Sequence, residues 1–340
     1  MILIECLNGL PTEYESFIIE KYDSFITSCR YIEVNYPNYD VYYMLVYESS
    51  VLIELIVFGN WEKTSTCFNS LVDIDQVVIQ KCTEKIFEIF PLIKKIRIEA
   101  SYKSYFLDRS FLIHRDNDQI LTLPSTIEEY SLKLGYHTRK NIKNRKVRLL
   151  RDYPEVKFRA VFRIDIEKSL INKIIQLNYD RLKYKGIIPT VNELYIDNIY
   201  NYSQHYGCVT YLEIEGVIIA GCISTALNKG VFVHVISFDT DFSKYNVGEI
   251  CMYYLIESSI ERKMSTFHFL WGKTEFKKRF LAESHLLYSY FIYRAYSLDF
   301  FYRKIKAVAS MTFNRIKLSK YSKPLRGLLK SYRKKYKCVI

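Results

Sequence analysis

The sequence lacks the features that mark several large classes of protein. No stretch approaches about 18 uninterrupted apolar residues, so no transmembrane helix is expected. The N-terminus has no basic region and contains Glu5, which argues against a signal peptide. The eight cysteines show no C-x-x-C spacing, so we expect reduced, mostly buried thiols in a cytoplasmic protein, and no metal site.

Acidic residues are absent from residues 300–340, although this tail contains 13 Lys and Arg. The whole chain has a net charge of +12, so residues 1–299 carry a net charge of −1. Apolar and basic residues alternate along the tail. These features predict a polyanionic partner, either an anionic membrane surface, nucleic acid or an acidic glycan. A solvated terminal helix is the alternative.

With 340 residues, of which 49% are hydrophobic, the chain is long enough for two domains of ordinary size. Both halves show one order of predicted elements, namely three strands, a helix and a further strand, although no repeat of individual residues is visible. We therefore predict an α/β (α+β) fold with two repeats, each a mostly antiparallel sheet flanked by helices. The domains are expected at residues 1–117 and 118–299, followed by the basic tail 300–340.

In the first half, apolar runs at residues 40–58 predict a hairpin that turns at Ser49 and Ser50, with a third strand starting at Trp61. No glycine loop precedes the next helix, because residues 73–76 read DIDQ. This half is therefore expected to support the second half rather than to bind a cofactor. Its other predicted elements are helices at residues 12–30 and 75–90 and a strand at residues 94–100.

In the second half, three strands at residues 209–238 lead into a loop and a helix that begins near Gly248. A short strand at residues 266–270 and the segment WGKTEFKKRF follow. A glycine at the start of a helix leaves free backbone N–H groups beside the positive end of the helix dipole. This arrangement suits an anion such as a pyrophosphate.

A basic segment lies upstream of these strands. Residues 125–128 (STIE) form a capping box, which predicts a helix that breaks at Gly135 and restarts near Thr138. Residues 133–151 contain eight Lys and Arg and no acid. Such a run is either a solvated helix face or one wall of an acceptor site. Two further helices are predicted, at residues 166–185 and from a capping box at residues 190–193 to Gly207.

The order of strands, glycine loop, helix and strand resembles the second half of a GNAT-type acyltransferase domain. Residues 271–280 (WGKTEFKKRF) resemble the closing G-x-x-x-Y-K motif of the CelD/BioF-like branch, which is related to the FemABX aminoacyl transferases. Residues 138–142 (TRKNI) resemble the basic run that this branch carries upstream. The resemblance extends over residues 118–296 and implies tandem GNAT-like domains, of which the C-terminal one is catalytic.

The resemblance implies acetyl-CoA or another acyl-CoA as co-substrate. The exposed edge of the strand VFVHVISF would pair with the amides of pantetheine, with Ile236 and Ser237 near the thioester. The loop keeps one glycine only, unlike the usual GNAT pattern, and the FemABX relatives use aminoacyl-tRNA instead. The pyrophosphate would lie at the start of the following helix, on Asn246, Val247, Gly248 and Glu249.

The resemblance also implies an acceptor pocket beside the upstream helices, near the loop 186–189. His268 and Lys277 are the candidate catalytic residues, although Phe276 replaces the tyrosine, and His268 the aspartate, that the branch usually carries. His234 and His268 both lie in apolar strands, where a histidine is more often a core residue than a base. The candidate acceptor-binding residues are Arg139, Arg181, Tyr184, Trp271 and Lys277.

These features predict an N-acyltransferase that moves an acyl group, expected to be acetyl, to an amine of an amino sugar or another precursor of cell-envelope polysaccharide. The first alternative is a FemABX-like transferase that uses aminoacyl-tRNA on a cell-wall precursor. The second is a non-catalytic basic binding module. We expect a cytoplasmic enzyme in peripheral contact with the inner membrane face through its tail. A specific nucleic-acid partner is expected only for a tRNA-dependent enzyme.

Overall fold

The computed structural model describes residues 2–9, 12–184, 186, 193–295, 298, 300–302, 304 and 305. The first half contains β1 (Ile2–Asn8), α1 (Glu15–Tyr22), α2 (Cys29–Asn35), β2 (Asp40–Glu48), β3 (Val51–Trp61), β4 (Thr64–Cys67), α3 (Gln76–Ile89), β5 (Lys95–Ser101) and β6 (Ser110–Thr122). The second half contains α4 (Ile127–Lys133), α5 (Tyr136–Asp152), β7 (Lys157–Phe162), α6 (Lys168–Tyr184), α7 (Glu193–Tyr206), β8 (Gly207–Ile214), β9 (Val217–Leu227), β10 (Gly230–Phe238), α8 (Val247–Glu261), β11 (Thr266–Trp271), α9 (Glu275–Arg279) and β12 (Glu283–Tyr293).

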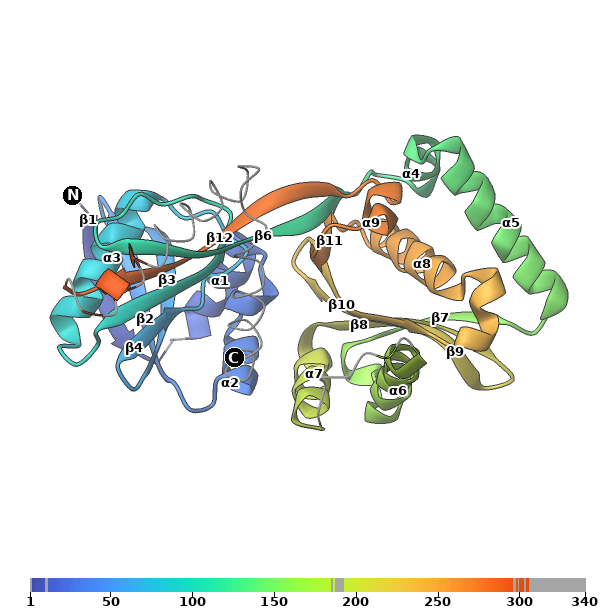
Figure 1. The fold of residues 1–340 in the computed structure, drawn as a ribbon, viewed down its shortest axis with the longest axis horizontal. Coiled ribbons are helices and arrows are strands. Elements are labelled where there is room, and N and C mark those ends of the chain that lie inside the picture. The colour runs from blue at the N-terminus through green and yellow to red at the C-terminus, as the bar shows by residue number, and fades with distance from the viewer. Residues whose placement is uncertain are drawn as a thin grey trace, which may run out of the picture.

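These strands form one twelve-stranded sheet in the order β1-β2-β3-β4-β5-β12-β6-β11-β10-β9-β8-β7. Advancing every strand number by six, and counting on from β1 after β12, gives the same order read from the other end of the sheet, which confirms the predicted structural repeat. At the centre, each half gives its last strand to the other, because β6 pairs with β11 and β12 pairs with β5. The two long exchanged strands connect the halves, which lie side by side (Figure 1). The predicted boundary between residues 117 and 118 lies inside β6.

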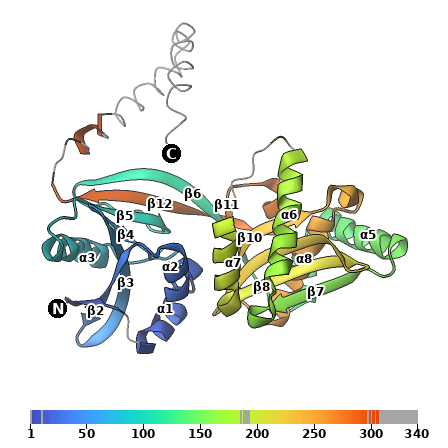
Figure 2. The ribbon, with the colours of Figure 1, turned by 90° about the horizontal axis from the view of Figure 1, so that it is seen from below.

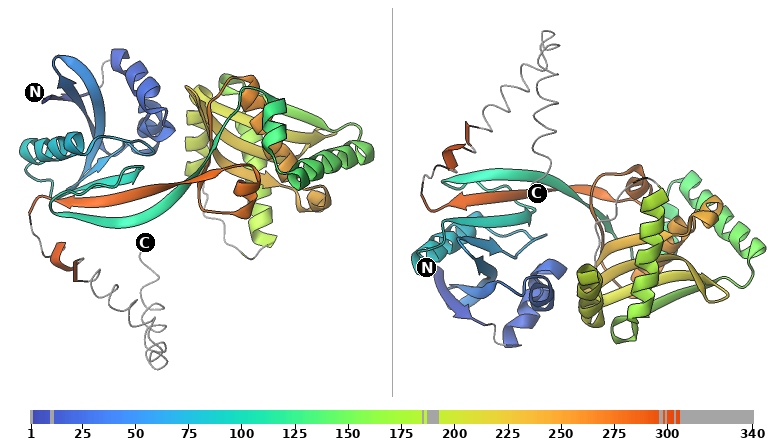
Figure 3. Two further views of the ribbon diagram at one scale, coloured as in Figure 1. Left: turned by 90° about the horizontal axis from the view of Figure 1, so that it is seen from above. Right: turned by 60° about the horizontal axis from the view of Figure 1, so that its bottom comes forward.

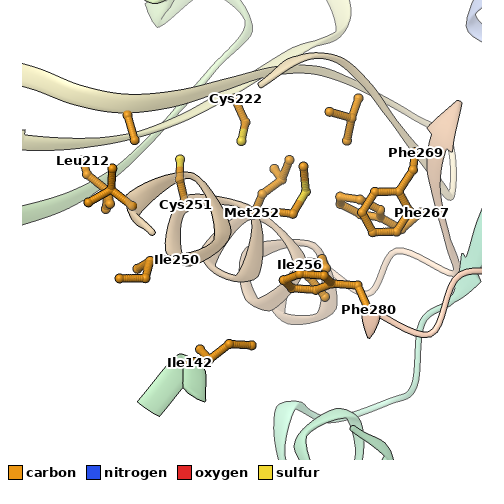
Figure 4. Close-up of a cluster of buried hydrophobic side chains, with 14 of the residues drawn as sticks. Ile142, Leu212, Cys222, Ile250, Cys251, Met252, Ile256, Phe267, Phe269 and Phe280 are labelled. Carbon is orange, nitrogen blue, oxygen red and sulfur yellow. The ribbon is translucent and has the colours of Figure 1, made fainter. Parts of the chain in front are cut away.

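Helices cover both faces of the second half of the sheet. Helix α8, with α5 beyond it, lies on one face, and α6 and α7 lie on the other (Figures 1 and 2). On the α8 face, Leu212, Cys222 and Phe267 of the sheet are buried together with Cys251 and Met252 of the helix (Figure 4). The α6 and α7 face buries a second cluster, which includes Ile171, Ile174, Ile199, Val209 and Ile223.

A separate cluster of buried side chains joins the two halves beside the exchanged strands. Phe25 and Leu71 come from the first half, and Tyr202, Phe232 and Leu270 come from the second. The views in Figure 3 show that the long strands β6 and β12 run from one half into the other. The halves therefore share both strands and apolar core, which makes the contact between them a fixed part of the fold.

The elements of the first half differ in detail from the prediction. The hairpin is confirmed, with Ser49 and Ser50 turning the chain at positive φ. The third strand does not start at Trp61, because Trp61 still belongs to β3 and pairs with Thr64 across the turn. The helix predicted at residues 12–30 is divided, because Asp23 adopts a left-handed conformation (φ 45°) and ends α1.

The predicted start of α4 lies one residue away from the observed one. The Thr126 hydroxyl accepts from the N–H of Glu129, and the Glu129 carboxylate accepts from the N–H of Ser125, as in a capping box. Gly135 separates α4 from α5 as predicted. Residues 190–192 of the second predicted capping box and residues 306–340 of the tail lie outside the described residues. In the part of the chain that is described, no helix is long and apolar enough to cross a membrane.

Candidate active site in the second half

The parallel strands β10 and β11 part before the end of β10. Three residues of β10, from Gly230 to Phe232, pair with three residues of β11. Beyond this point β10 continues to Phe238 and, among the described strands, pairs only with β9 on its other side. The edge that faces β11 is therefore open from Val233 onward. Backbone N–H and C=O groups on such an edge can pair with the amides of a ligand.

A β-bulge in β10 lies at the point where the strands part. Val233 pairs with Ser224 and Val235 with Ile223, so His234 is the extra residue. Bulges redirect side chains and are frequent next to active sites. His234 Nε2 lies 2.6 Å from the Thr225 hydroxyl. Burial lowers the pKa of His234 to about 4, so its imidazole is neutral at physiological pH.

A cavity of about 370 Å³ opens at the same point. Val233 and His234 of β10 line it, together with Leu270 and Trp271 of β11. None of its described lining residues is Lys, Arg, Asp or Glu. The cavity therefore suits a neutral polar group that can contact aromatic rings. Its other polar walls come from α2 and α7, which contribute Tyr31, Asn35, Tyr195, Asn198 and Tyr202.

One buried hydroxyl in this cavity lacks a partner. Tyr202 is 4% exposed, and among the described residues no atom is placed to hydrogen-bond with its Oη, although Thr225 is near. The ring meets those of Tyr31 and His234 edge-on. Leaving a buried hydroxyl unsatisfied costs about 1–3 kcal/mol, which a bound polar group would recover.

The start of α8 combines a helix N-terminus with two arginine side chains. Asn246 precedes the helix in a left-handed conformation (φ 51°), and its side chain does not cap the first turn. The Glu249 carboxylate forms ion pairs with Arg145 of α5 and with Arg279 of α9. An anion at this N-terminus would therefore meet the positive end of the helix dipole and two guanidinium groups.

The predicted cofactor residues lie where β10 ends and α8 begins. Ile236 packs towards α8, whereas the Ser237 hydroxyl donates to a backbone carbonyl of α6, so neither side chain points along the open edge. Val247 and Gly248 are buried. A Cβ at Gly248 would lie 2.8 Å from the Phe238 ring, so packing alone requires this glycine. The donor assignment of these residues stays a prediction.

His268 belongs to a buried network that links the two halves. Its Nδ1 lies 2.6 Å from Asp118 Oδ2 and its Nε2 lies 3.2 Å from the Thr266 hydroxyl. Asp118 of β6 is fully buried and also accepts a hydrogen bond of 2.7 Å from Tyr102. The imidazole stacks on Phe232 at 4.3 Å. Both ring nitrogens of His268 have a hydrogen-bond partner within the protein, so neither is free to take a proton from a substrate. These contacts suit a residue that positions its neighbours better than they suit the predicted catalytic base.

Lys277 of α9 closes the end of β11. Its Nζ donates to the carbonyl oxygens of Leu270 (3.1 Å) and Trp271 (2.5 Å). Burial lowers the pKa of Lys277, and the negative charge of Asp118 opposes this shift. Leu270 and Trp271 are cavity residues. Lys277 therefore fixes one wall of the cavity, and its predicted catalytic role stays a prediction.

The predicted acceptor residues do not gather in one place. Trp271 is 44% exposed and lines the cavity. Arg139 lines a second cavity, between α5 and α8. The Arg181 guanidinium lies over the ring of Phe238 at the end of β10, and burial lowers the pKa of Arg181. Tyr184, at the end of α6, is exposed. The contacts of Arg139, Arg181 and Lys277 do not bring these three residues together.

Several residues of the site were not predicted from the sequence. Tyr31 and Asn35 come from the first half, and no local pattern marks them as cavity residues. Arg145 lies within the predicted basic helix and Arg279 within the WGKTEFKKRF segment, so each had a weak signal. The buried Asp118 had none. Among the described residues, no cluster of His, Cys, Asp and Glu is arranged to hold a metal ion.

Residues 137–278, from α5 to α9, match the family model described as "Acetyltransferase (GNAT) domain". The parted strands, the cavity wall of β11 and the start of α8 all lie within the matched residues. Residues 137–278 form a GNAT-type acyltransferase domain. The predicted superfamily and the class of enzyme are thereby confirmed, and the donor and the acceptor belong to the proposal below.

Solved structures share this fold across both halves. FemX superimposes with a TM-score of 0.62 at 8% identity, covering 84% of this chain and 96% of FemX. L-PGS from Bacillus licheniformis has a TM-score of 0.54 at 12% identity, and the match covers 85% of this chain and 94% of L-PGS. A conserved protein of unknown function from Bacteroides thetaiotaomicron VPI-5482 has a TM-score of 0.54 at 15% identity, and the match covers 85% of this chain and 99% of that protein. No curated protein matches the chain.

Proposed function

We propose that the protein transfers an acyl group, expected to be acetyl, from acyl-CoA to an amine of an amino sugar or a related precursor of surface polysaccharide. The observation that carries this proposal is the parting of β10 and β11, with a neutral, aromatic cavity at the same point. The open strand edge gives the donor a place to pair. The cavity gives the acceptor a separate space beside it.

For the donor, the open edge of β10 from Val233 onward would pair with the two amides of pantetheine. The start of α8 would hold the pyrophosphate, with Arg145 and Arg279 beside it. Acyl-CoA supplies the acyl group in activated form, as a thioester. Glu249 pairs with both arginines, so a bound phosphate would compete with this carboxylate for the guanidinium groups.

For the acceptor, the cavity offers groups that suit a sugar. The rings of Tyr31 and Trp271 can pack on the apolar face of a sugar ring, and the amides of Asn35 and Asn198, 3.3 Å apart, can bind its hydroxyls. The unpartnered Tyr202 hydroxyl can bind another. The acceptor amine has to be neutral to attack the thioester, and none of the described lining residues is a carboxylate that would stabilise its charged form.

His234 is the residue that we propose to take the proton from the amine. When its Nε2 donates to the Thr225 hydroxyl, its Nδ1 carries a free lone pair. Burial keeps the ring neutral across the physiological range, so Nδ1 is available to accept a proton. Its pKa of about 4 makes it a weak base, which takes the proton only as positive charge develops on the attacking nitrogen. His234→Gln should lower kcat while leaving the affinity for acetyl-CoA unchanged, whereas Tyr202→Phe should mainly raise the KM for the acceptor.

The donor is tested by thermal stabilisation and calorimetry with acetyl-CoA and, in parallel, with charged tRNA. A ligand that binds only the native state adds about 2.7 kcal/mol of stability at a hundred times its Kd. Stabilisation by acetyl-CoA supports the proposal. Stabilisation by charged tRNA and not by acetyl-CoA or uncharged tRNA would instead favour the aminoacyl transferase. If neither ligand binds, the proposed enzyme is wrong and a non-catalytic binding module is favoured.

The basic tail, residues 300–340, is proposed to hold the enzyme at an anionic membrane surface. Each Lys or Arg near such a surface contributes about 1 kcal/mol, and salt screens the attraction. Removing residues 306–340 should abolish binding to vesicles that contain anionic lipid and leave acetyl-CoA binding intact. Unchanged vesicle binding after truncation would contradict this proposal.

A further inference from the structure

A second cavity, of about 640 Å³, lies between α5 and α8, away from the parted strands. Tyr253 and Glu257 on its α8 wall lie six and ten residues after Val247, which is about 9 and 15 Å along the helix axis. The cavity is therefore separate from the start of α8, where the donor is proposed to bind. Its basic lining residues are Arg139, Lys140, Lys143 and Lys146, all on α5.

The charge of this cavity is mostly of one sign. Four basic side chains face one carboxylate, that of Glu257, whose pKa is raised by burial and lowered in part by Lys146. Among the described residues, the ion pairs of α5 involve Arg145 and Arg151 only, so Lys140 and Lys143 have no acidic partner. The cavity therefore has unbalanced positive charge in a concave site, which attracts an anionic ligand.

Helix α5 carries far more charge than its packing requires. Ile142 and Leu149 are its buried residues, and both belong to the cluster that includes α8, as Figure 4 shows for Ile142. Seven of its 17 residues are Lys or Arg. Like charges three or four residues apart, such as Lys140 and Lys143, destabilise an isolated helix by about 0.2–0.5 kcal/mol per pair. An anion bound along the helix would remove this repulsion.

The surroundings of these charges favour a nucleic acid over a membrane. Tyr136 is 61% exposed at the cavity, and the Lys140 ammonium lies 5.6 Å from the centre of its ring. An exposed ring among basic side chains is the usual platform for an unpaired base and its phosphate. A bilayer is too flat to enter a concave cavity. The basic residues run from Arg139 to Arg151, over about 18 Å of helix, which exceeds the length of one nucleotide.

We propose that the cavity between α5 and α8, together with the basic face of α5, binds single-stranded nucleic acid. Lys140, Lys143 and Lys146 contact phosphates, and Tyr136 stacks on a base. The site binds through the backbone and through stacking, so it has little sequence preference. This proposal does not depend on the donor or the acceptor proposed above.

The test is fluorescence anisotropy with the full chain and a labelled RNA of about 12 nucleotides, within the usual site size for such grooves. Lys140→Glu combined with Lys143→Glu should weaken binding at least about tenfold and make it less dependent on salt, because phosphate contacts are lost. The matched control is Lys173→Glu with Lys183→Glu on α6, which changes the net charge equally and should weaken binding less than about twofold. The basic tail is the same in all variants and contributes one constant background.

Stacking and ligand class are tested separately. Tyr136→Phe should retain RNA binding and Tyr136→Ala should lose it about fivefold or more, because one stacked base contributes about 1–3 kcal/mol. Acetyl-CoA binding, measured on the same variants, should not change. Equal losses of RNA binding in the α5 and α6 variants would overturn the proposal. It would also be overturned if the α5 variants kept RNA binding and instead lost binding to anionic vesicles or to acetyl-CoA.

Discussion

The two halves share one topology but differ where their parallel strands meet. In the first half, every residue of β4, from Thr64 to Cys67, pairs with β5. The chain after β4 then stays beside β5, where the Leu71 N–H donates to the Ala100 carbonyl at 2.8 Å. In the second half, β10 has nine residues and pairs with β11 at three of them. One half therefore closes the space that the other leaves open for a ligand.

The helix that follows each strand pair differs in charge. At the start of α3, the Asp75 carboxylate accepts a hydrogen bond of 2.7 Å from the Val77 N–H. This negative cap satisfies the helix end and repels another anion. At the start of α8, Arg145 and Arg279 lie beside an N-terminus that no side chain caps. The repeat thus has one helix start closed to anions and one suited to them.

This difference indicates what the first half does. It contributes no open strand edge of its own at β4, but Phe25, Tyr31 and Asn35 line the cavity of the second half. The exchanged strands and the shared apolar cluster hold these side chains in place. The first half is therefore best described as one wall of the site, which agrees with the supporting role that its missing glycine loop predicts.

The largest expected effect comes from breaking the link between the halves. Asp118→Ala removes the buried partner of His268 and Tyr102. Each buried polar group that is left without its hydrogen-bond partner costs about 1–3 kcal/mol, and two groups, the His268 ring and the Tyr102 hydroxyl, lose theirs. We expect this loss in urea unfolding, with both halves unfolding in one transition. Asp197→Ala, which removes an exposed pair with Lys168, should cost about 1 kcal/mol or less.

A loss below about 1 kcal/mol for Asp118→Ala would show that the network contributes no more than a surface pair. Two separate unfolding transitions in the unmodified protein would contradict the view that the halves form one cooperative unit.

The next effect concerns ligand binding and sharpens the contrast between the two helix starts. Arg145→Ala and Arg279→Ala should each weaken acetyl-CoA binding about tenfold, because each removes a cation from the α8 N-terminus and leaves Glu249 less neutralised. Calorimetry measures this directly. Arg151 on the same helix forms an exposed ion pair with the neighbouring Asp152, so Arg151→Ala serves as the control. We expect it to change the affinity less than about twofold. Unchanged affinity in both test variants would place the pyrophosphate elsewhere.

Local sequence patterns predicted the parts of this fold that depend on neighbours in the chain. The strands from residue 209 to 238, the start of α8 and the break at Gly135 follow from β-branched runs and glycines within a few residues. The structural repeat was predicted for the same reason, since each half shows its own order of elements. The predicted start of the third strand at Trp61 is three residues too early, because the chain turns at Glu62, between Trp61 of β3 and Thr64 of β4.

The site itself depends on contacts between distant residues. Asp118 and His268 are 150 residues apart, and Arg145 and Glu249 are 104 residues apart. The exchange of β6 and β12 brings the first pair together, and no local pattern encodes which strand crosses. The bulge at His234 depends on its register with β9. A histidine that the sequence placed in an apolar strand therefore proved to line the cavity.

A smaller effect tests the closed helix start of the first half. Asp75→Ala should destabilise the protein by about 1 kcal/mol, because it removes the side-chain cap of α3. Asp75→Asn should restore most of this loss, since an amide oxygen can accept the same hydrogen bond. Neither change should alter acetyl-CoA affinity. If Asp75→Ala created a second binding site in calorimetry, the carboxylate would be the main barrier to anion binding in this half.

The smallest effect concerns Asp23, which joins α1 to the turn before β10 by accepting hydrogen bonds from the N–H groups of Lys229 and Gly230. Burial raises the pKa of Asp23 from 3.8 to about 6, although these hydrogen bonds oppose the shift. The folded state therefore binds the proton more tightly than the unfolded state does. The contribution of Asp23 to stability is greatest below about pH 4 and declines as the pH rises through about 6, where the carboxylate in the folded protein is half charged.

Asp23→Asn removes that charge while its amide oxygen can still accept both hydrogen bonds, and Asn tolerates the left-handed backbone at φ 45°. We expect the variant to be more stable than the unmodified protein by about 1 kcal/mol at pH 8, less than the full shift implies, because solvent reaches part of the group. The difference should disappear at pH 4. Urea unfolding between pH 4 and 8 measures it, with the exposed Asp165→Asn as a control that should show no such trend. A variant that is less stable at pH 8 would mean that the charged form strengthens the contact between the halves.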